Sequence, residues 1–430
     1  MGHGNERYCG STPRQGARAP HPVASFTAMS PFDDPATLER FARLAVGFAA
    51  NVQPGQVVQV KTEIGKEAVT RAIAVEAYRA GAKYVDVEYF DLHVKRARLE
   101  HAAEDTLDWV PDWLGAKLMA LSDARAARIA LSGPAEPRLL DGIDPARSGK
   151  DQLPALKETG AVVNARTTNW AILPCPTRPW AAEVHPDLDG EQAWARLGEQ
   201  LLHVCRLDEE DPVAAWRARA AFLVGAAERL TAARFDAIRF RGEGTDLRVG
   251  LLPSSRWLAA QFTTAEGIAH MPNLPSEEVF TSPDPARVDG VVRATKPLVL
   301  GGSVIRGLEV EFAGGVAVRI DAEEGADVLR GYAAKDPGAA RLGEVALVDG
   351  DGRIGKLDTV FYDTLLDENA ASHIALGHAY AFGAGEEDQD RLNRSAIHVD
   401  FMIGSGAMEV DGLDASGGAL PVLRDGAWQL

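Results

Sequence analysis

The chain has 430 residues, of which 46% are hydrophobic and 25% charged, a composition typical of a globular protein with two or three domains. The formal net charge of -17 argues against nucleic-acid binding through bulk charge, and no run of about 18 apolar residues predicts a membrane span. Three widely spaced cysteines, Cys9, Cys175 and Cys205, give neither a disulfide framework nor a zinc ribbon. We therefore expect reduced thiols in a cytoplasmic enzyme, and we divide the chain into two domains.

Residues 1–29 are predicted to be a disordered extension, because this segment is rich in Gly, Pro and Arg and shows no apolar periodicity. It also lacks the continuous apolar core of a signal peptide. Met29 is an alternative start, because ordinary helix signals follow it at once.

Strands alternate with helices over residues 30–230, which predicts an N-terminal α/β domain with a mainly parallel sheet. Asp34 and Pro35 have the types expected of an N-cap and of the first helical position. The strands predicted in this domain cover residues 57–60, 84–89, 128–131 and 161–164. The helices predicted there cover residues 38–48, 67–80, 113–121, 191–204 and 213–232. Residues 168–170 and 174–180 are predicted to form a loop, either a structural connection or one wall of a substrate site.

Short strands dominate residues 231–430, which predicts a C-terminal α+β domain with a largely antiparallel sheet. Gly314 and Gly315 are typical of a hairpin turn between two of these strands. The strands predicted in this domain cover residues 237–241, 247–251, 291–294, 304–312 and 316–320. The helices predicted there cover residues 324–333 and 367–380.

The second of these helices carries residue types that suit a metal site. Its first residues, Asp367, Glu368 and Asn369, fit N-terminal capping and the helix dipole, so we do not assign them as ligands. On a helix, His373 and Tyr380 share one face, together with Gly377. A lone histidine on a helix is usually structural, so His373 needs partners from elsewhere.

Further candidate ligands come from three strand-like segments. His398 and Asp400 are two positions apart and point the same way on a strand. Either they hydrogen bond only to each other or they bind a metal such as zinc, cobalt or manganese. Glu344 lies in an apolar strand, and only one member of the Glu277–Glu278 pair faces a site, because neighbours on a strand point oppositely. Three carboxylates and two imidazoles match a two-metal hydrolase, in which cations about 4 Å apart share a water and lower its pKa.

The motifs that carry these residues resemble the M29 family of metallopeptidases, the thermophilic aminopeptidases. The resemblance covers about residues 30–412 and rests on four C-terminal segments and one N-terminal segment: NLPSEEVFTSP at 273–283, RLGEVALV at 341–348, TLLDENAASHIALGHAY at 364–380, HVDFMIGS at 398–405 and NWAILPCPTRPW at 169–180. The family implies an aminopeptidase with two divalent metal ions, an α/β N-terminal domain, a C-terminal catalytic domain and a homodimer.

Matched motif by motif, the family implies a set of site residues. The implied metal ligands are Glu278, Glu344, His373, His398 and Asp400. Tyr380 matches the family's active-site tyrosine and is expected to donate to the developing oxyanion. Our own choice for the bridging ligand is Glu344, and either Glu278 or Glu344 is expected to move the proton. Glu278 is favoured over Glu277, and His378 is left out because it lies on another face of the predicted helix. The expected substrate is a peptide with a free N-terminus.

Two other functions remain open from the sequence. One is a different dinuclear metal-dependent amidohydrolase that acts on small amides. The other is a non-enzymatic binding protein in which the His–Asp pairs are structural. N-acylated substrates distinguish the first from an aminopeptidase, and metal analysis tests the second.

Overall fold

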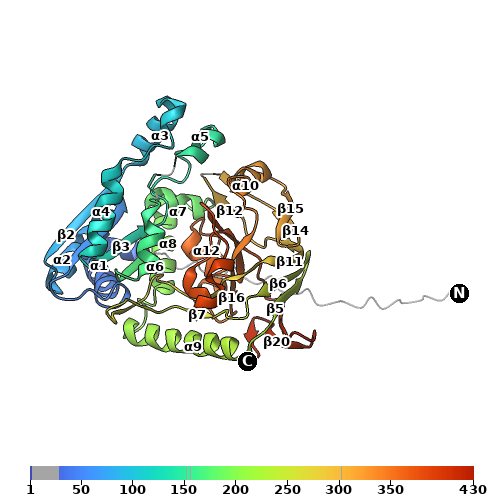
Figure 1. The fold of residues 1–430 in the computed structure, drawn as a ribbon. Coiled ribbons are helices and arrows are strands. Elements are labelled where there is room, and N and C mark those ends of the chain that lie inside the picture. The colour runs from blue at the N-terminus through green and yellow to red at the C-terminus, as the bar shows by residue number, and fades with distance from the viewer. Residues whose placement is uncertain (2–28, 152, 155, 302) are drawn as a thin grey trace.

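The computed structural model describes residues 1, 29–151, 153–154, 156–301 and 303–430. Most of the predicted N-terminal extension therefore lies outside the described residues. Figure 1 shows the N-terminal half, in blue and green, beside the C-terminal half, in yellow to red. None of the described helices is both long and apolar enough to cross a membrane.

Four parallel strands form the sheet of the N-terminal half, in the order β2-β1-β3-β4. Their bounds are Val57–Glu63 (β1), Tyr84–Phe90 (β2), Ala127–Ser132 (β3) and Trp170–Pro174 (β4). Helices follow or precede each strand along the chain (Figure 1). The predicted parallel α/β architecture is confirmed.

This half contains nine α-helices, counted over the described residues. They are α1 (Pro35–Leu44), α2 (Glu67–Arg79), α3 (Leu92–His101), α4 (Asp112–Asp123), α5 (Pro145–Lys150), α6 (Glu158–Ala165), α7 (Arg178–Val184), α8 (Gly190–Val204) and α9 (Pro212–Ala233). The predicted start of α1 is confirmed, because the Asp34 carboxylate accepts hydrogen bonds from the amides of Ala36 and Thr37. The first helix continues for one turn as a π-helix, Ala45–Ala49. The proposed domain boundary near residue 230 falls within α9.

Two predictions in this half are wrong. Residues 161–164 belong to helix α6 and not to a strand, because a short apolar run does not distinguish the two by periodicity. Trp170 and Pro174, predicted to lie in a loop, are the two ends of strand β4 at the edge of the sheet, and residues 178–180 of the same predicted loop begin helix α7. Pro174 ends this strand, and an edge position tolerates proline because its missing N–H leaves the ladder intact.

Antiparallel sheets dominate the C-terminal half, as predicted. A five-stranded sheet has the order β18-β17-β16-β10-β7, and an eight-stranded sheet has the order β15-β14-β11-β6-β5-β19-β20-β21. The strands of the first sheet are β7 (Leu258–Ala259), β10 (Glu278–Thr281), β16 (Leu342–Val348), β17 (His373–Gly377) and β18 (His398–Met402). Those of the second are β5 (Ala237–Gly242), β6 (Thr245–Leu251), β11 (Pro283–Arg293), β14 (Glu309–Ala313), β15 (Val316–Asp321), β19 (Glu409–Leu413), β20 (Ala419–Arg424) and β21 (Ala427–Trp428).

Short elements complete this half. They are the paired strands β8 (Phe262–Thr263) and β9 (Ala269–His270), the paired strands β12 (Leu298–Leu300) and β13 (Ser303–Ile305), and the helices α10 (Ala326–Ala333), α11 (Arg353–Lys356) and α12 (Thr364–Glu368). The hairpin predicted at Gly314–Gly315 joins β14 to β15. The strand predicted over residues 304–312 is instead divided between β13 and β14.

The helix predicted over residues 367–380 is also wrong, and the error bears directly on the site. The short helix α12 ends at Glu368, and β17 begins at His373 between β16 and β18 in the five-stranded sheet. All five residues of β17 are buried. A central strand buried on both faces has a continuous apolar pattern that resembles a buried helix, so the sequence did not distinguish them.

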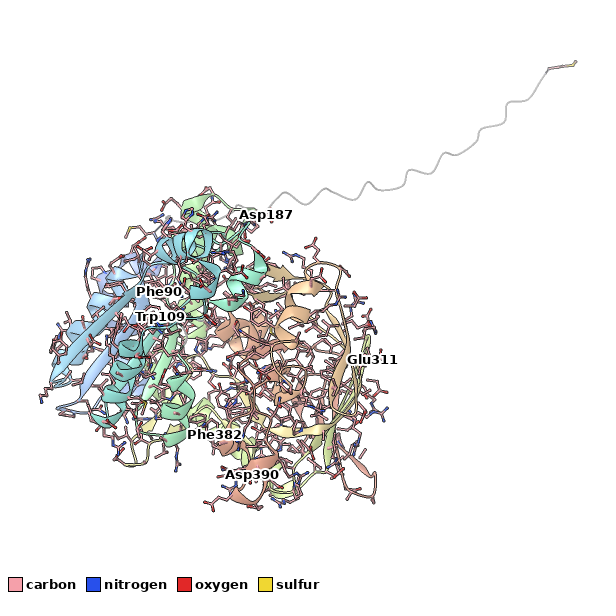
Figure 2. All side chains as sticks on the ribbon, turned by 45° about the horizontal axis from the view of Figure 1, so that its top comes forward. Phe90, Trp109, Asp187, Glu311, Phe382 and Asp390 are labelled. Carbon is pink, nitrogen blue, oxygen red and sulfur yellow. The ribbon has the colours of Figure 1, made fainter. Side chains whose placement is uncertain are left out.

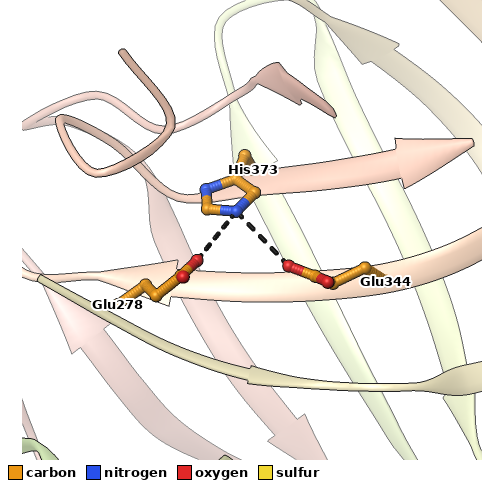
Figure 3. A group of neighbouring side chains, drawn as sticks. All are labelled: Glu278, Glu344 and His373. Carbon is orange, nitrogen blue, oxygen red and sulfur yellow. Dashed lines mark ion pairs between the residues drawn. The ribbon is translucent and has the colours of Figure 1, made fainter. Parts of the chain in front are cut away.

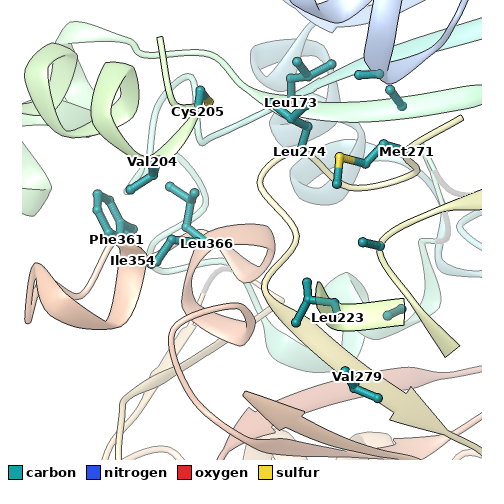
Figure 4. Close-up of a cluster of buried hydrophobic side chains, with 14 of the residues drawn as sticks. Leu173, Val204, Cys205, Leu223, Met271, Leu274, Val279, Ile354, Phe361 and Leu366 are labelled. Carbon is teal, nitrogen blue, oxygen red and sulfur yellow. The ribbon is translucent and has the colours of Figure 1, made fainter. Parts of the chain in front are cut away.

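One hydrophobic core connects the two halves. Figure 4 shows Leu173 of β4 and Val204 of α8 in the same cluster as Phe361 and Val279 from the C-terminal half. Trp180 is fully buried, and its indole N–H donates to the carbonyl oxygen of Phe361 at 2.6 Å. The two halves are thus held against each other, and Figure 2 shows Phe382 at their junction.

Candidate metal centre and active site

The candidate ligands lie on four neighbouring elements of the five-stranded sheet. Glu278 opens β10, Glu344 lies in β16, His373 opens β17, and His398 and Asp400 lie in β18. Side chains two residues apart on a strand share a face, and the register places Ala375 of β17 opposite both Glu344 and Asp400. The small side chain of Ala375 leaves room for the carboxylates on either side of it.

A backbone irregularity positions Glu344. The pairing of β16 with β17 shifts register between Leu342 and Glu344, and Gly343 fills the gap. A Cβ atom added to Gly343 would lie 2.3 Å from the carbonyl oxygen of His378. Only glycine fits this close approach, so Gly343 fixes the direction of the glutamate that follows it.

Two groups of possible ligands share Glu344. The first contains Glu278, Glu344 and His373, and Figure 3 shows the His373 ring between the two carboxylates. The His373 Nε2 atom is 3.0 Å from Glu278 Oε2 and 3.5 Å from Glu344 Oε1. All the donor atoms of this group lie within 4.8 Å of one another.

The second group contains Glu344, His398 and Asp400. The His398 Nε2 atom is 3.4 Å from Asp400 Oδ1 and 3.7 Å from Glu344 Oε2. The predicted common direction of His398 and Asp400 is therefore found in the structure. Because the two oxygens of Glu344 face different histidines, this residue lies between the two groups.

Both histidines present the same ring nitrogen to the carboxylates. The Nδ1 atom of His373 is 3.1 Å from the carbonyl oxygen of Ala371, and that of His398 is 2.8 Å from the carbonyl oxygen of His378. A carbonyl oxygen only accepts, so each Nδ1 carries the proton it donates. In the neutral ring, Nε2 then has the free lone pair that a metal requires.

Burial and negative charge shift the pKa values in this cluster. Burial raises the pKa of Glu344, and burial together with Asp400 and Glu278 raises the pKa of Glu368 well above its usual value. Burial alone would lower the pKa of His398, but Asp400 and Glu344 outweigh it and raise this pKa to about 10. Glu278 and Glu344 likewise raise the pKa of His373 well above its usual value despite its burial. The protein thus concentrates negative charge that attracts cations, whether protons or metals.

The donor set fits divalent metal ions. Glu278 Oε2 and Asp400 Oδ1 are buried and accept no well-directed hydrogen bond among the described residues; their near neighbours are the Nε2 atoms of His373 and His398, which donate only when the rings are protonated. A buried carboxylate that faces only a neutral histidine nitrogen is costly, and metal ligation is one of the ways in which proteins compensate for that cost. Imidazole with carboxylate suits zinc, cobalt or manganese.

The adjacent Glu277 has a different environment. Its carboxylate is fully buried and pairs with Arg206 at 3.0 Å and with Arg219 at 2.5 Å. Arg219 also pairs with Asp349 at 3.0 Å. Glu277 therefore ties helix α9 to the sheet, while Glu278 lies in the first ligand group, which is the division we expected for two neighbouring acids.

Asp367, Glu368 and His378, which the sequence did not predict to be ligands, do not lie on the predicted helix. Asp363, and not Asp367, caps α12, and the Asp367 carboxylate accepts hydrogen bonds from the amides of Phe361 and Asp363. Glu368 ends α12 and lines the same cavity as the two groups, so it belongs to the site. His378 also lines that cavity, although it belongs to neither group. The sequence did not identify Glu368 as a site residue, because the predicted helix over residues 367–380 explained its charge as N-terminal capping. Prediction of a strand at residues 373–377 would have placed Glu368 beside the site.

A cavity of about 630 Å³ opens onto the cluster. Tyr380 lines it, and burial together with Glu344 and Asp400 raises the pKa of this phenol well above its usual value, so it keeps its proton. The Tyr380 ring stacks on Phe382 at 5.1 Å and lies 5.3 Å from the His398 ring, measured between ring centroids. Phe262, at 5.0 Å from Phe382, and Phe280 continue this aromatic wall.

The two cysteines in the described part of the chain do not contribute to this chemistry. Cys175 and Cys205 are both buried and unoxidised. Burial raises the pKa of Cys175 to about 12, which leaves its thiol unreactive at neutral pH.

The fold and the site together define a hydrolase of the metal-dependent class, and comparison with known proteins gives its family. The family described as thermophilic metalloprotease (M29) matches residues 34–428. Aminopeptidase T of Thermus thermophilus is 43% identical over 91% of this chain and 98% of its own length. Aminopeptidase PepS of Streptococcus thermophilus is 35% identical over 91% of this chain and 97% of its own.

A solved structure agrees with the sequence comparison. Wild-type AmpT from Thermus thermophilus superposes with a TM-score of 0.84 at 41% identity, covering 91% of this chain and 99% of that one. The chain belongs to the M29 family of metallopeptidases. The prediction of an M29 metallo-aminopeptidase is thereby confirmed, and family membership implies divalent metal ions.

Proposed function

We propose that this enzyme removes the N-terminal residue of peptides by means of a dinuclear metal centre in which Glu344 bridges the two ions. The observation that carries the proposal is the pair of ligand groups that share Glu344 at the wall of one cavity. Glu278 and His373 would hold one ion, and His398 and Asp400 the other. Bound there, two divalent cations would supply a water of lowered pKa and a positive charge opposite the scissile carbonyl oxygen.

Glu368 completes this centre in our proposal. Glu278, Glu344, Glu368 and Asp400 together carry four negative charges when ionised, which balances two divalent cations with both histidines neutral. Without Glu368 the centre would retain one positive charge in a buried place, which is unfavourable. The pKa of Glu368, raised by burial, Asp400 and Glu278, reflects how closely it shares their surroundings.

The chain's own groups then perform the remaining steps. A glutamate of the centre, Glu278 or Glu344, would accept the proton of the attacking water, because both carboxylates lie beside His373 at the wall of the cavity. The protonated Tyr380 hydroxyl donates a hydrogen bond to the oxyanion that develops on the scissile carbonyl. The aromatic wall of Phe262, Phe280 and Phe382 excludes water beside the reacting atoms.

We further propose zinc, cobalt or manganese as the metals, a homodimer as the assembly and the cytoplasm as the compartment. Reduced thiols at Cys175 and Cys205 agree with that compartment. The names of the relatives support a peptide substrate with a free N-terminus.

The test compares an amino-acid p-nitroanilide with its N-acetyl derivative after loading with zinc or cobalt. We expect hydrolysis of the free amine and little hydrolysis of the acetylated form. Equal rates on both would instead favour an amidohydrolase that acts on small amides. A purified protein that neither binds divalent ions nor gains activity with them would favour a binding protein.

A further inference from the structure

The wall of the cavity opposite the metal centre comes from the parallel sheet. Gln59 and Lys61 of β1 and Arg128 of β3 line the same cavity as Glu278 and Glu344. The sheet is joined to the metal side directly, because the amide of Ile172 in β4 donates to the carbonyl oxygen of Pro272 at 2.7 Å. The chain then reaches Glu278 within six residues. One cavity is thus shared by both sheets.

This face of the sheet departs from the usual pattern of parallel strands. Such strands are normally buried on both faces and apolar throughout. Here β3 alternates strictly, with Ala127, Ile129 and Leu131 buried in the core and Arg128 half-buried on the cavity side. In β1, Val58 and Val60 face the core, whereas Gln59 and Lys61 share the face of Arg128, since Gln59 pairs with Arg128 in register. Packing alone does not require cations at these positions.

Lys61 and Arg128 have no carboxylate within 4.0 Å in the part of the chain that the structure describes, although other cations nearby do. Lys117 pairs with both acids of the neighbouring strand, Asp86 at 2.8 Å and Glu88 at 2.9 Å. Lys61 Nζ instead donates to the carbonyl oxygen of Pro154 at 2.8 Å, and Arg128 Nε donates to Gln59 Oε1 at 3.0 Å. Both cations thus have neutral partners and retain donors for an anion.

Burial makes an anionic partner more favourable for Lys61 and Arg128. It is the main reason that the pKa of Lys61 and that of Arg128 are both lowered, with Glu88 only partly opposing it. A cation held away from water gains more from an anion than an exposed one does. The cavity is therefore polarised, with unpaired cations on one wall and a cluster of carboxylates on the other.

We propose that Lys61 and Arg128 bind the C-terminal carboxylate of the substrate, so that the enzyme selects short peptides whose two ends reach both walls of the cavity. This inference rests on the proposed aminopeptidase function and specifies its substrate class. A short peptide at neutral pH has an ammonium group at one end and a carboxylate at the other. Its carboxylate complements the charges of Lys61 and Arg128 on one wall when its N-terminus lies at the metal centre on the other.

The test uses a length series, Leu-Gly, Leu-Gly-Gly, Leu-Gly-Gly-Gly and Leu-Gly-Gly-Gly-Gly, each as the free acid and as the C-terminal amide. At the length that spans the cavity, we expect kcat/KM for the acid to exceed that for the amide by roughly 10-fold or more, as a charge-assisted hydrogen bond supplies. The Lys61→Met and Arg128→Met variants should lower this acid-to-amide ratio towards one.

Lys95→Met is the matched control. Lys95 donates to the carbonyl oxygen of Leu153, beside the partner of Lys61, but it is near Asp151 at 3.8 Å and does not line the cavity. This variant should keep the wild-type ratio. Equal rates for acid and amide at every length, or an unchanged ratio in both cavity variants, would overturn the inference while leaving aminopeptidase activity on the amides intact. Failure to hydrolyse any member of the series would contradict the proposed function itself.

Discussion

The two sheets that border the cavity both present charged side chains to it, but the charges have opposite signs. The parallel sheet buries its apolar side chains on one face and presents Lys61 and Arg128 on the other. The antiparallel sheet presents Glu278, Glu344, His398 and Asp400, with His373 buried behind them. In neither sheet does folding require charges at these positions; the carboxylates of one wall suit metal ions, and the cations of the other suit the carboxylate end of a substrate.

The largest effect should follow from removing the shared charge of the antiparallel sheet. Glu344→Gln removes the residue common to both ligand groups, and we expect kcat to fall on the order of 10⁴-fold, about 5.5 kcal/mol of activation free energy. Elemental analysis of the purified variant should show that it has lost both metal ions. By contrast, His373→Ala and His398→Ala each affect one group and should each lose one ion. A Glu344→Gln variant that keeps two ions would contradict the bridging role.

A smaller effect should follow from removing a donor that holds no metal. Tyr380→Phe keeps the aromatic ring that stacks on Phe382 but removes its hydroxyl. We expect kcat to fall by roughly 10²–10³, with metal content unchanged, because one oxyanion donor is lost. Steady-state kinetics beside elemental analysis measures both quantities. Phe382→Leu is a control for packing and should leave the hydroxyl contribution in place.

Removal of the Glu277 carboxylate, which two arginines already neutralise, should affect stability more than activity. Glu277→Gln leaves Arg206 and Arg219 partly unpaired in a buried place, and we expect unfolding to become easier by about 3 kcal/mol. Glu278→Gln, one residue later, should instead reduce activity and metal content, and in the metal-free state it should cost less stability than Glu277→Gln because Glu344 still faces His373. Denaturant unfolding of the two variants tests this contrast, and a reversed pattern would show that the two neighbouring acids have been assigned the wrong way round.

The mildest test varies only the pH. In the metal-free protein, the pKa of His398 is raised to about 10 by Asp400 and Glu344, so its protonated form stabilises the fold. This stabilisation is complete below the unfolded pKa of about 6.5 and is lost as the pH rises through about 10. Zinc must displace that proton, so binding at pH 7 should release protons, and apparent affinity should rise with pH. Calorimetry in buffers of different ionisation enthalpy measures the release, and its absence would contradict the account.

Much of the fold could be predicted from the sequence because its patterns are local. The cap formed by Asp34 and Pro35, the alternation in β2 and the two glycines between β14 and β15 each identify an element without tertiary information. The failures came from segments whose state depends on their neighbours. Strand β17 is central and buried on both faces, so its apolar run resembled a helix until strands β16 and β18 were placed beside it.

In the candidate site too, residues in local motifs were predicted, and residues placed by tertiary structure were not. The motif resemblance supplied Glu278, Glu344, His373, His398 and Asp400, and the structure gathers these side chains around one residue, Glu344. Glu368 was not identified from the sequence, because its position at the site depends on where α12 ends. Lys61 and Arg128 were not identified from the sequence, because no local pattern indicates that the N-terminal sheet borders the same cavity.

Anomalous diffraction from zinc-loaded crystals tests the central claim most directly. The account predicts two zinc peaks separated by about 4 Å, with the Glu344 carboxylate between them, one ion bound by His373 and the other by His398. A single peak, or two peaks that do not share Glu344, would contradict it.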